Sequence, residues 1–189
     1  MVCSICKKDG HTKKTCPGVV VEPVEYESAS TYIDEDEMAK MEELMELLME
    51  VATTLRKGRS ESVYQNAILL ELQEKGIKYT TEETIPILYK GKFVGIERID
   101  IAFQSWLPLI IELKAVSTDV KPEHFWQVLS YMRTKETKFG MVVNFNQSLT
   151  KDLEMEFVFL HKDQPYRVNL VEDTLMPIQD YDYTQVEKN

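Results

Sequence analysis

Two apolar runs that carry charges, within residues 98–115 (RIDIAFQSWLPLIIELKA), constrain the fold of this chain more than any other stretch. Their aliphatic and β-branched residues predict two buried strands joined by a turn. Asp100 lies inside the first strand, and Glu112 and Lys114 lie inside the second. Because a buried charge is costly unless it is paired or holds a metal, these three side chains form either a structural ion pair or a functional site.

The chain of 189 residues is long enough for one well-packed domain and a small appendage. No apolar run approaches the roughly 20 residues that span a bilayer, and the N-terminus lacks the apolar region of a signal peptide. All three cysteines fall in the first 16 residues, in a pattern that suits metal binding better than disulfides. We therefore expect an intracellular protein with no membrane partner, in the cytoplasm or nucleus.

The net charge of -10 is unevenly distributed along the chain. Residues 22–50 contain 11 acids and one lysine, whereas residues 51–151 contain 14 basic and 11 acidic residues. The acidity lies mainly in the former segment and in the tail after residue 151. Overall charge therefore does not exclude a polyanionic partner.

Hydrophobic periodicity divides the chain into four segments: a cysteine-rich head at 1–17, an acidic linker at 18–35, a globular domain at 36–175 and a polar tail at 176–189. Within the domain we expect helices and strands in the order α-α-β-β-β-α-β, followed by a C-terminal hairpin. The helices are expected at 38–56, 60–76 and 121–135, and the strands at 84–89, 93–103, 108–116 and 139–145, with the hairpin at 154–172. This order predicts an α/β fold with a central sheet between helices.

The head contains four residues of the types that bind zinc, with the spacing C-x2-C-x4-H-x4-C: Cys3, Cys6, His11 and Cys16. Zinc prefers four such ligands in a tetrahedron, and so short a segment depends on the metal for its folding free energy. We therefore predict a structural Zn²⁺.

This spacing resembles the CCHC zinc knuckle of retroviral nucleocapsids, a family that binds single-stranded nucleic acid. The resemblance implies that the head contacts phosphates through its lysines, which are Lys7, Lys8, Lys13 and Lys14. Ser4 stands where the family commonly places an aromatic residue for base stacking. A zinc-stapled knob that docks onto another protein is the alternative.

Strand geometry brings the charges of the opening run together. Residues two apart share one face of a strand, so Glu112 and Lys114 point the same way. If the two strands pair, Asp100 approaches Glu112, and a hard divalent cation would relieve the repulsion between two carboxylates. With Lys114 beside them, this is a layout for metal-assisted hydrolysis of a phosphodiester. The alternative is a surface ion pair between Glu112 and Lys114.

Five further stretches occur in order: residues 58–76, 89–103, 110–116, 124–132 and 141–145. Together they resemble the GxxExxY family of the PD-(D/E)XK nuclease superfamily, over about residues 36–146. The motif that names the family is present as Gly58, Glu61 and Tyr64.

The resemblance implies a restriction-endonuclease-like core, a central mixed sheet flanked by helices, with the active site on one sheet edge. By position, Asp100, Glu112 and Lys114 correspond to the catalytic triple of the superfamily. Glu61 corresponds to a helix acid that reaches the metal through water, and Gln127 to a helix glutamine that orients the site. The implied cofactor is Mg²⁺ or Mn²⁺, bound by Glu61, Asp100 and Glu112.

Arg98 is a candidate phosphate contact, and His124 and Tyr131 are expected on the same helix face as Gln127. Tyr64 and Tyr131 are expected to pack in the core.

The sequence therefore predicts a divalent-metal-dependent nuclease, with DNA favoured over RNA, whose zinc knuckle aids nucleic-acid binding. The rival is a non-catalytic nucleic-acid-binding or packaging protein that keeps the fold. A third interpretation is autoinhibition, in which the acidic segment 22–50 imitates phosphate. A homodimer is also compatible with the sequence. A knuckle joined to this nuclease-like core suggests a protein of a eukaryote or of a large DNA virus, in the host cell or the virion.

Overall fold

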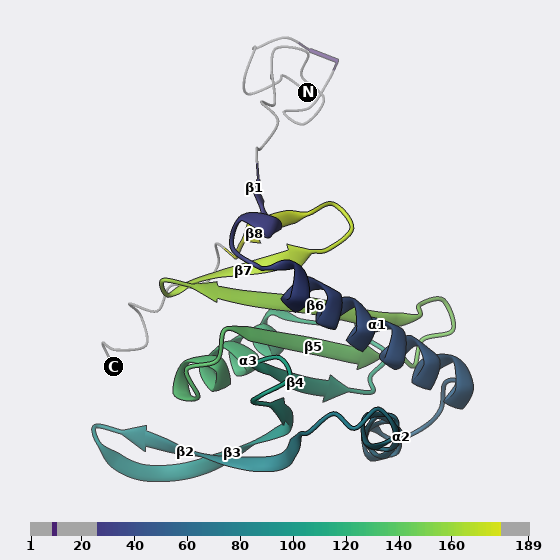
Figure 1. The fold of residues 1–189 in the computed structure, drawn as a ribbon, viewed down its shortest axis with the longest axis horizontal. Helices are drawn as coiled ribbons and strands as arrows, with labels where there is room; N and C mark the ends of the chain where they lie inside the picture. Colours follow the sequence, from purple (N-terminus) through teal and green to yellow (C-terminus); the bar gives the residue numbers. More distant parts are fainter. Residues whose placement is uncertain (1–8, 11–25, 179–189) are drawn as a thin grey trace.

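The computed structural model describes residues 9–10 and 26–178, and all structural statements below refer to these residues. They form one mixed sheet of eight strands, in the order β1-β8-β7-β6-β5-β4-β3-β2 (Figure 1). The strands are β1 (Glu27–Ser28), β2 (Thr80–Tyr89), β3 (Lys92–Phe103), β4 (Leu109–Lys114), β5 (Phe139–Phe145), β6 (Leu153–His161), β7 (Gln164–Asn169) and β8 (Thr174–Pro177). The helices are the short 3-10 helix η2 (Ala29–Thr31) and the α-helices α1 (Glu35–Leu55), α2 (Glu61–Glu74) and α3 (Pro122–Thr134).

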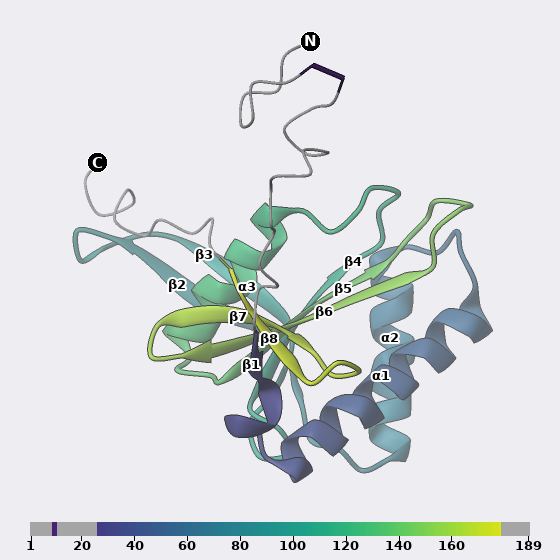
Figure 2. The same cartoon turned by 90° about the horizontal axis from the view of Figure 1, so that it is seen from above.

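Helices cover the sheet on both faces. α1 and α2 lie on one face, and α3 lies on the other (Figure 2). Each face has its own apolar core, so the central strands are buried on both sides. Strand β5 shows the result in its sequence, FGMVVNF, in which every residue is buried.

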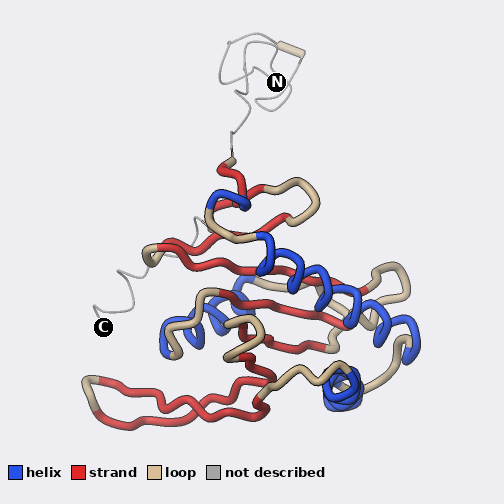
Figure 3. The backbone as a smooth tube through the Cα atoms, in the orientation of Figure 1, coloured by secondary structure: helices blue, strands red, loops and turns tan. Residues whose placement is uncertain are grey.

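The connection between β4 and β5 makes the sheet mixed. These two strands pair in parallel, from Leu109↔Phe139 to Lys114↔Asn144, while the other neighbouring pairs of the described sheet are antiparallel. Parallel neighbours need a crossover, and α3 supplies it (Figure 3). A mixed sheet with flanking helices fits the α/β restriction-endonuclease-like fold that the sequence predicted.

Helix α1 begins with a capping box. The Asp34 side chain accepts a hydrogen bond from the Glu37 backbone N–H at 2.8 Å, and the Glu37 side chain accepts one from the Asp34 N–H at 3.1 Å. The helix ends at Leu55, one residue before the expected end, and Arg56 adopts a positive φ of 55°. Its buried stripe, which packs on the sheet, is Met41, Leu44, Leu47, Leu48 and Val51. This acidic helix is therefore part of the core.

The segment 18–35, expected to be a linker, is part of the fold from residue 26 onward. Glu27–Ser28 form β1, which pairs with β8, and Ala29 and Ile33 are buried in the core beneath α1. Likewise β8 extends to Pro177, so the fold continues past residue 175. A strand of two residues has no periodicity that a sequence could reveal, which explains the miss.

Strands β2 and β3 form a long antiparallel ribbon. Their register shifts between Ile87 and Leu88, and the far half of the ribbon extends beyond the end of β4 (Figure 1). None of the helices in the described residues is long and apolar enough to cross a membrane.

Candidate active site

Strands β3 and β4 separate at the position of the predicted site. Their ladder runs from Phe103↔Leu109 to Ile101↔Ile111 and then stops. Beyond this point a side chain replaces a backbone carbonyl as the hydrogen-bond acceptor. Asp100 Oδ2 accepts a hydrogen bond from the Leu113 N–H at 2.7 Å. Both strands are interior in the sheet order, so the expectation of a site at a sheet edge is corrected. The site opens where two inner strands diverge.

Glu112 is the most deeply buried carboxylate of the site, with 3% of the residue exposed. Its Oε1 accepts a hydrogen bond from Lys114 Nζ, and its Oε2 is buried without a hydrogen-bond partner among the described residues. Burial and the nearby charge of Asp100 raise the pKa of Glu112 to about 7, although Lys114 opposes the shift. The described neighbours of Glu112 therefore do not fully compensate its negative charge.

Asp100 is half-buried and Glu61 is exposed, and both interact electrostatically with Glu112. Burial raises the pKa of Asp100, while the Leu113 N–H and Lys114 lower it in part. Burial likewise raises the pKa of Glu61, the first residue of α2, with an opposing effect from Lys114 and a further rise from Asp100. The charge of Lys114 thus acts on the pKa of all three carboxyl groups, Glu61, Asp100 and Glu112.

Two neighbours of Asp100 were not identified from the sequence. Gln65, one turn after Glu61 on α2, donates from Nε2 to the Asp100 backbone carbonyl at 3.1 Å and so ties the helix to β3. Glu82 on β2 has a positive φ of 52° and adds a negative charge near Asp100 and Glu61. The spacing of Gln65 from Glu61 was the available signal, whereas Glu82 gave none.

Arg98 does not stand free beside the site. Its Nη1 lies 2.9 Å from Glu82 Oε2, and both side chains are largely exposed. An exposed ion pair contributes little to stability, so phosphate could compete with Glu82 for this arginine.

Helix α3 presents a polar face toward the carboxylates. Gln127 donates from Nε2 to the Tyr131 hydroxyl at 2.8 Å, which confirms that these two residues share a face. Burial raises the pKa of Tyr131 to about 12, and Glu112 and Asp100 add to the rise. Burial and the charge of Lys114 lower the pKa of His124. The described hydrogen bond of the Gln127 amide is to Tyr131.

The remaining motif residues fix the position of Glu61. Gly58 adopts a φ of 89°, where a side chain would be strained, and its N–H donates to Gln147 Oε1 at 2.6 Å. Tyr64 is buried and stacks on Phe145, with ring centroids 4.1 Å apart, and its hydroxyl donates to the Arg56 carbonyl at 2.6 Å. These contacts confirm that Tyr64 packs in the core.

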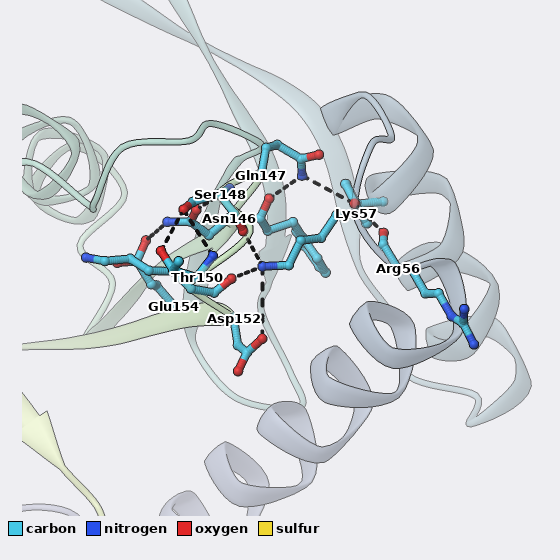
Figure 4. A network of polar contacts seen from close by, with 11 residues as sticks. Arg56, Lys57, Asn146, Gln147, Ser148, Thr150, Asp152 and Glu154 are labelled. Atoms are coloured by element: carbon cyan, nitrogen blue, oxygen red, sulfur yellow. Dashed lines mark hydrogen bonds and ion pairs between the residues drawn. The ribbon is translucent and has the colours of Figure 1, made fainter.

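Lys57 also holds the junction between α1 and α2, residues 56–60, in place. Its Nζ donates to the carbonyls of Ser148 and Lys151 and lies 4.0 Å from Asp152 Oδ1 (Figure 4). Together with Gln147, it anchors the α1–α2 connection to the loop that follows β5. The start of α2, and with it Glu61, is therefore held by the loop beyond the central strand.

A cavity of about 310 Å³ lies beside this junction and not at the carboxylates. Its lining is mostly apolar and includes Met49, Ala52, Tyr64, Phe145 and Leu153. The carboxyl groups with raised pKa values, and not this cavity, are therefore the candidate functional site.

The oxygen donors of the site suit a hard divalent cation. Glu112 Oε2 is an orphaned, buried acceptor next to a second carboxylate, which is the feature that a cation would satisfy. In the side-chain arrangement of the described residues, however, no three His, Cys, Asp or Glu groups come together to hold a metal, and Lys114 occupies Glu112. The cation and the lysine would share this carboxylate.

The predicted zinc ligands Cys3, Cys6, His11 and Cys16 lie outside the described residues. The same holds for the four lysines of the head. The structure therefore describes neither the knuckle nor its phosphate contacts.

The fold and the site define an α/β protein with clustered carboxylates and a lysine between two diverging strands. The sequence model of the PD-(D/E)XK nuclease superfamily matches residues 38–156, more than half of the chain. The chain belongs to the PD-(D/E)XK nuclease superfamily. This membership suggests a phosphodiesterase acting on nucleic acid, and such nucleases generally use divalent metals such as Mg²⁺ or Mn²⁺.

Similarity beyond the family is limited. A solved structure titled "Crystal structure of SSO0001" is similar to the chain, with a TM-score of 0.41 and 15% sequence identity. The match covers 64% of this chain and 58% of that one. No curated protein matches the chain.

Proposed function

We propose that this protein is a divalent-metal-dependent nuclease that hydrolyses phosphodiester bonds, in DNA by preference. The observation that supports it most is the buried, unpartnered Oε2 of Glu112 beside Asp100, in a chain of this superfamily. Gly58, Glu61 and Tyr64 match the spacing of the GxxExxY family, which supports that finer assignment.

Each site residue has a role that follows from its chemistry. Asp100 and Glu112 would hold Mg²⁺ or Mn²⁺, with Glu61 assisting through water. The bound cation would supply positive charge to stabilise a pentavalent phosphate and its leaving oxygen.

Lys114 and Gln127 complete the site. An ammonium group has three donors, so Lys114 can bond Glu112 and still orient a water or a phosphate oxygen. Gln127 supports the site through Tyr131. Arg98 is proposed as a phosphate contact once it leaves Glu82.

The head extends the proposal. Cys3, Cys6, His11 and Cys16 would bind a structural Zn²⁺, and the lysines between them would hold nucleic acid near the site. Reduced cysteines with zinc suit the cytoplasm or nucleus, where we place the protein.

The test is cleavage of plasmid, linear duplex, single-stranded DNA and RNA in Mg²⁺, Mn²⁺ or EDTA. We expect metal-dependent cleavage that falls by about a thousandfold or more in Asp100→Asn and Glu112→Gln. Glu50→Gln, which changes an exposed acid on α1, serves as the matched control and should retain activity.

If wild type and variants bind every substrate equally and cleave none, the protein is the non-catalytic binder. Cleavage that persists in both site variants would place the chemistry elsewhere.

A further inference from the structure

The far half of the β2–β3 ribbon has a surface that the fold does not use. Five large apolar side chains between residues 88 and 96 are more than half exposed, and Phe93 reaches 65%. They are Leu88, Tyr89, Phe93, Val94 and Ile96. A group of exposed apolar residues on one element marks an interaction surface.

The ribbon has two distinct faces. Directly opposed residues of an antiparallel pair share a face, so Leu88 and Phe93 lie together on one side, next to Pro86 and Ile96. Tyr89 and Lys92 oppose one another on the other side. Each face thus carries one aromatic ring near the turn.

Cations without carboxylate partners gather at the same turn. Lys90 Nζ lies over the Tyr89 ring at 5.2 Å from its centroid, and no described carboxylate pairs with Lys90 or Lys92. Between Glu83 and Glu97 the ribbon contains no acid. In a chain with a net charge of -10, this local excess of positive charge favours a polyanionic partner.

A second unpaired group lies on the other side of the site. Arg56 and Arg59, in the connection that precedes Glu61, are exposed and have no carboxylate partner among the described residues. The carboxylate site therefore lies between two groups of free cations, one at the start of α2 and one at the ribbon turn.

The ribbon is continuous with the site, because β3 carries both Phe93 and Asp100. At about 3.3 Å per residue, Phe93 lies roughly 23 Å from Asp100 along the strand. That length corresponds to about seven stacked nucleotides.

A second copy of the chain fits the ribbon less well. Symmetric contact of two ribbon turns would bring the lysines of both copies together. Strand pairing along the free edge of β2 is opposed by Pro86, which has no N–H, and by the positive φ of Glu82.

We propose that residues 86–96 bind a single-stranded stretch of the substrate nucleic acid next to the carboxylate site. The strand passes over the ribbon turn, so that its bases stack on Phe93 on one face and on Tyr89 on the other, and Lys90 and Lys92 contact its phosphates. This inference rests on the proposed function, since it names the form of nucleic acid that the site receives.

The experiment measures binding of labelled single strands to the full chain in EDTA, by fluorescence anisotropy. A long strand (about 20 nucleotides) reaches the ribbon from the site, whereas a short one (about four) does not. The variants are Lys90→Glu with Lys92→Glu, and Tyr89→Ser with Phe93→Ser. The controls are Lys162→Glu, at the turn between β6 and β7 with a φ similar to that of Lys90, and Leu70→Ser, an exposed apolar residue on α2.

We expect the charge variant to weaken binding of the long strand by about tenfold at low salt. The aromatic variant should weaken it by about 5- to 100-fold. Binding of the short strand, and of the long strand to both controls, should change less than about twofold.

The outcomes separate the two proposals. Unchanged binding in both ribbon variants of a protein that cleaves nucleic acid overturns the ribbon inference and leaves the nuclease intact. Weakened binding in a protein that cleaves nothing supports the ribbon and overturns the nuclease. A smaller mass of the aromatic variant in light scattering, with unchanged nucleic-acid affinity, assigns the ribbon to a homodimer and overturns the inference.

Discussion

At the scale of single residues, the site holds buried negative charge that its described neighbours neutralise incompletely. Glu112 is buried on β4, Lys114 is its ion-pair partner among the described residues, and Asp100 adds a second negative charge. A buried ion pair repays its desolvation only when the remaining acceptors are also satisfied. Because Oε2 of Glu112 is not, the metal-free site should destabilise the protein at neutral and alkaline pH.

This leads to a prediction for Glu112→Gln. The pKa of Glu112 is about 7 in the folded state against 4.5 in a model peptide. Between these values the folded state binds more protons than the unfolded state, so the free energy of unfolding contributed by this group falls as pH rises. In EDTA, Glu112→Gln should be more stable than wild type at pH 8, by about 1–3 kcal/mol, with the difference vanishing near pH 4.

Urea denaturation across this pH range provides the measurement, with Glu50→Gln as the control. Mg²⁺ added at pH 8 should stabilise the wild type and not Glu112→Gln. Parallel pH curves for the two proteins would contradict a raised pKa at Glu112.

Part of the candidate site could be predicted from local rules, because alternation along a strand places Glu112 and Lys114 on one face. The assignment of Asp100, Glu61 and Gln127 to the same site rested on the resemblance to the nuclease family. Glu82, Gln65 and Gln147 were missed, since their partners Arg98, Asp100 and Gly58 lie 16, 35 and 89 positions away in the sequence. Only the folded chain brings such pairs together.

At the scale of elements, the packing of α3 against β5 positions the helix residues that face the site. Gly140 on β5 leaves room for α3, because an added Cβ would lie 2.3 Å from Val128 Cγ1 and 2.6 Å from Met132 Sδ. The β-branched valine has little freedom to move away. Since Val128 and Met132 adjoin Gln127 and Tyr131 on the helix, this contact also positions the polar face of α3.

We therefore predict that Gly140→Ala destabilises the protein by about 1–3 kcal/mol, through overpacking of β5 against α3. Gly95→Ala is the matched control, because a Cβ there meets no atom within 4 Å, and it should change stability by less than about 0.5 kcal/mol. Thermal or urea unfolding measures both. Equal stability of the two variants would show that α3 can shift without cost.

At the same scale, sequence patterns found the long elements and missed the short ones. The apolar stripe of α1 and the apolar run of β5 each extend over many residues, so their patterns could be recognised in the sequence. β1 and η2 comprise five residues in all, and tertiary contacts with β8 define them. The extent of the β2–β3 ribbon beyond the core was likewise invisible, because exposed and buried strands share the same residue types.

For the whole molecule, the boundary of the fold decides how the head can be studied. The described fold begins at Tyr26, whereas Ala29 and Ile33 are buried and Asp34 caps α1. Deleting residues 1–34 would therefore damage the core as well as remove the acidic linker. A cut after residue 25 separates the two effects.

We predict that a protein lacking residues 1–25 unfolds at the same urea concentration as the full chain. Its affinity for single-stranded nucleic acid should fall severalfold, because the lysine-rich head no longer raises the local concentration of substrate. Removal through residue 34 should cost about 2–5 kcal/mol through loss of the helix cap and of buried Ile33. Unfolding curves and anisotropy check these expectations.

A gain of affinity or activity on removing residues 1–25 would instead support autoinhibition by the acidic segment. The apolar stripe of α1 holds the rest of that segment on the sheet in the truncated protein, so this experiment tests residues 22–25 of the acidic segment.

The pairing of β1 with β8 has a consequence for synthesis on the ribosome. Ser28 hydrogen bonds to Asp173, 145 positions later in the chain. At about 5–20 residues per second, the first strand emerges roughly 7–30 s before its partner. By the end of that interval the strands and helices of the carboxylate site have been made, while the N-terminal strand is still unpaired. The part of the fold that carries the carboxylates can therefore assemble before β1 pairs with β8.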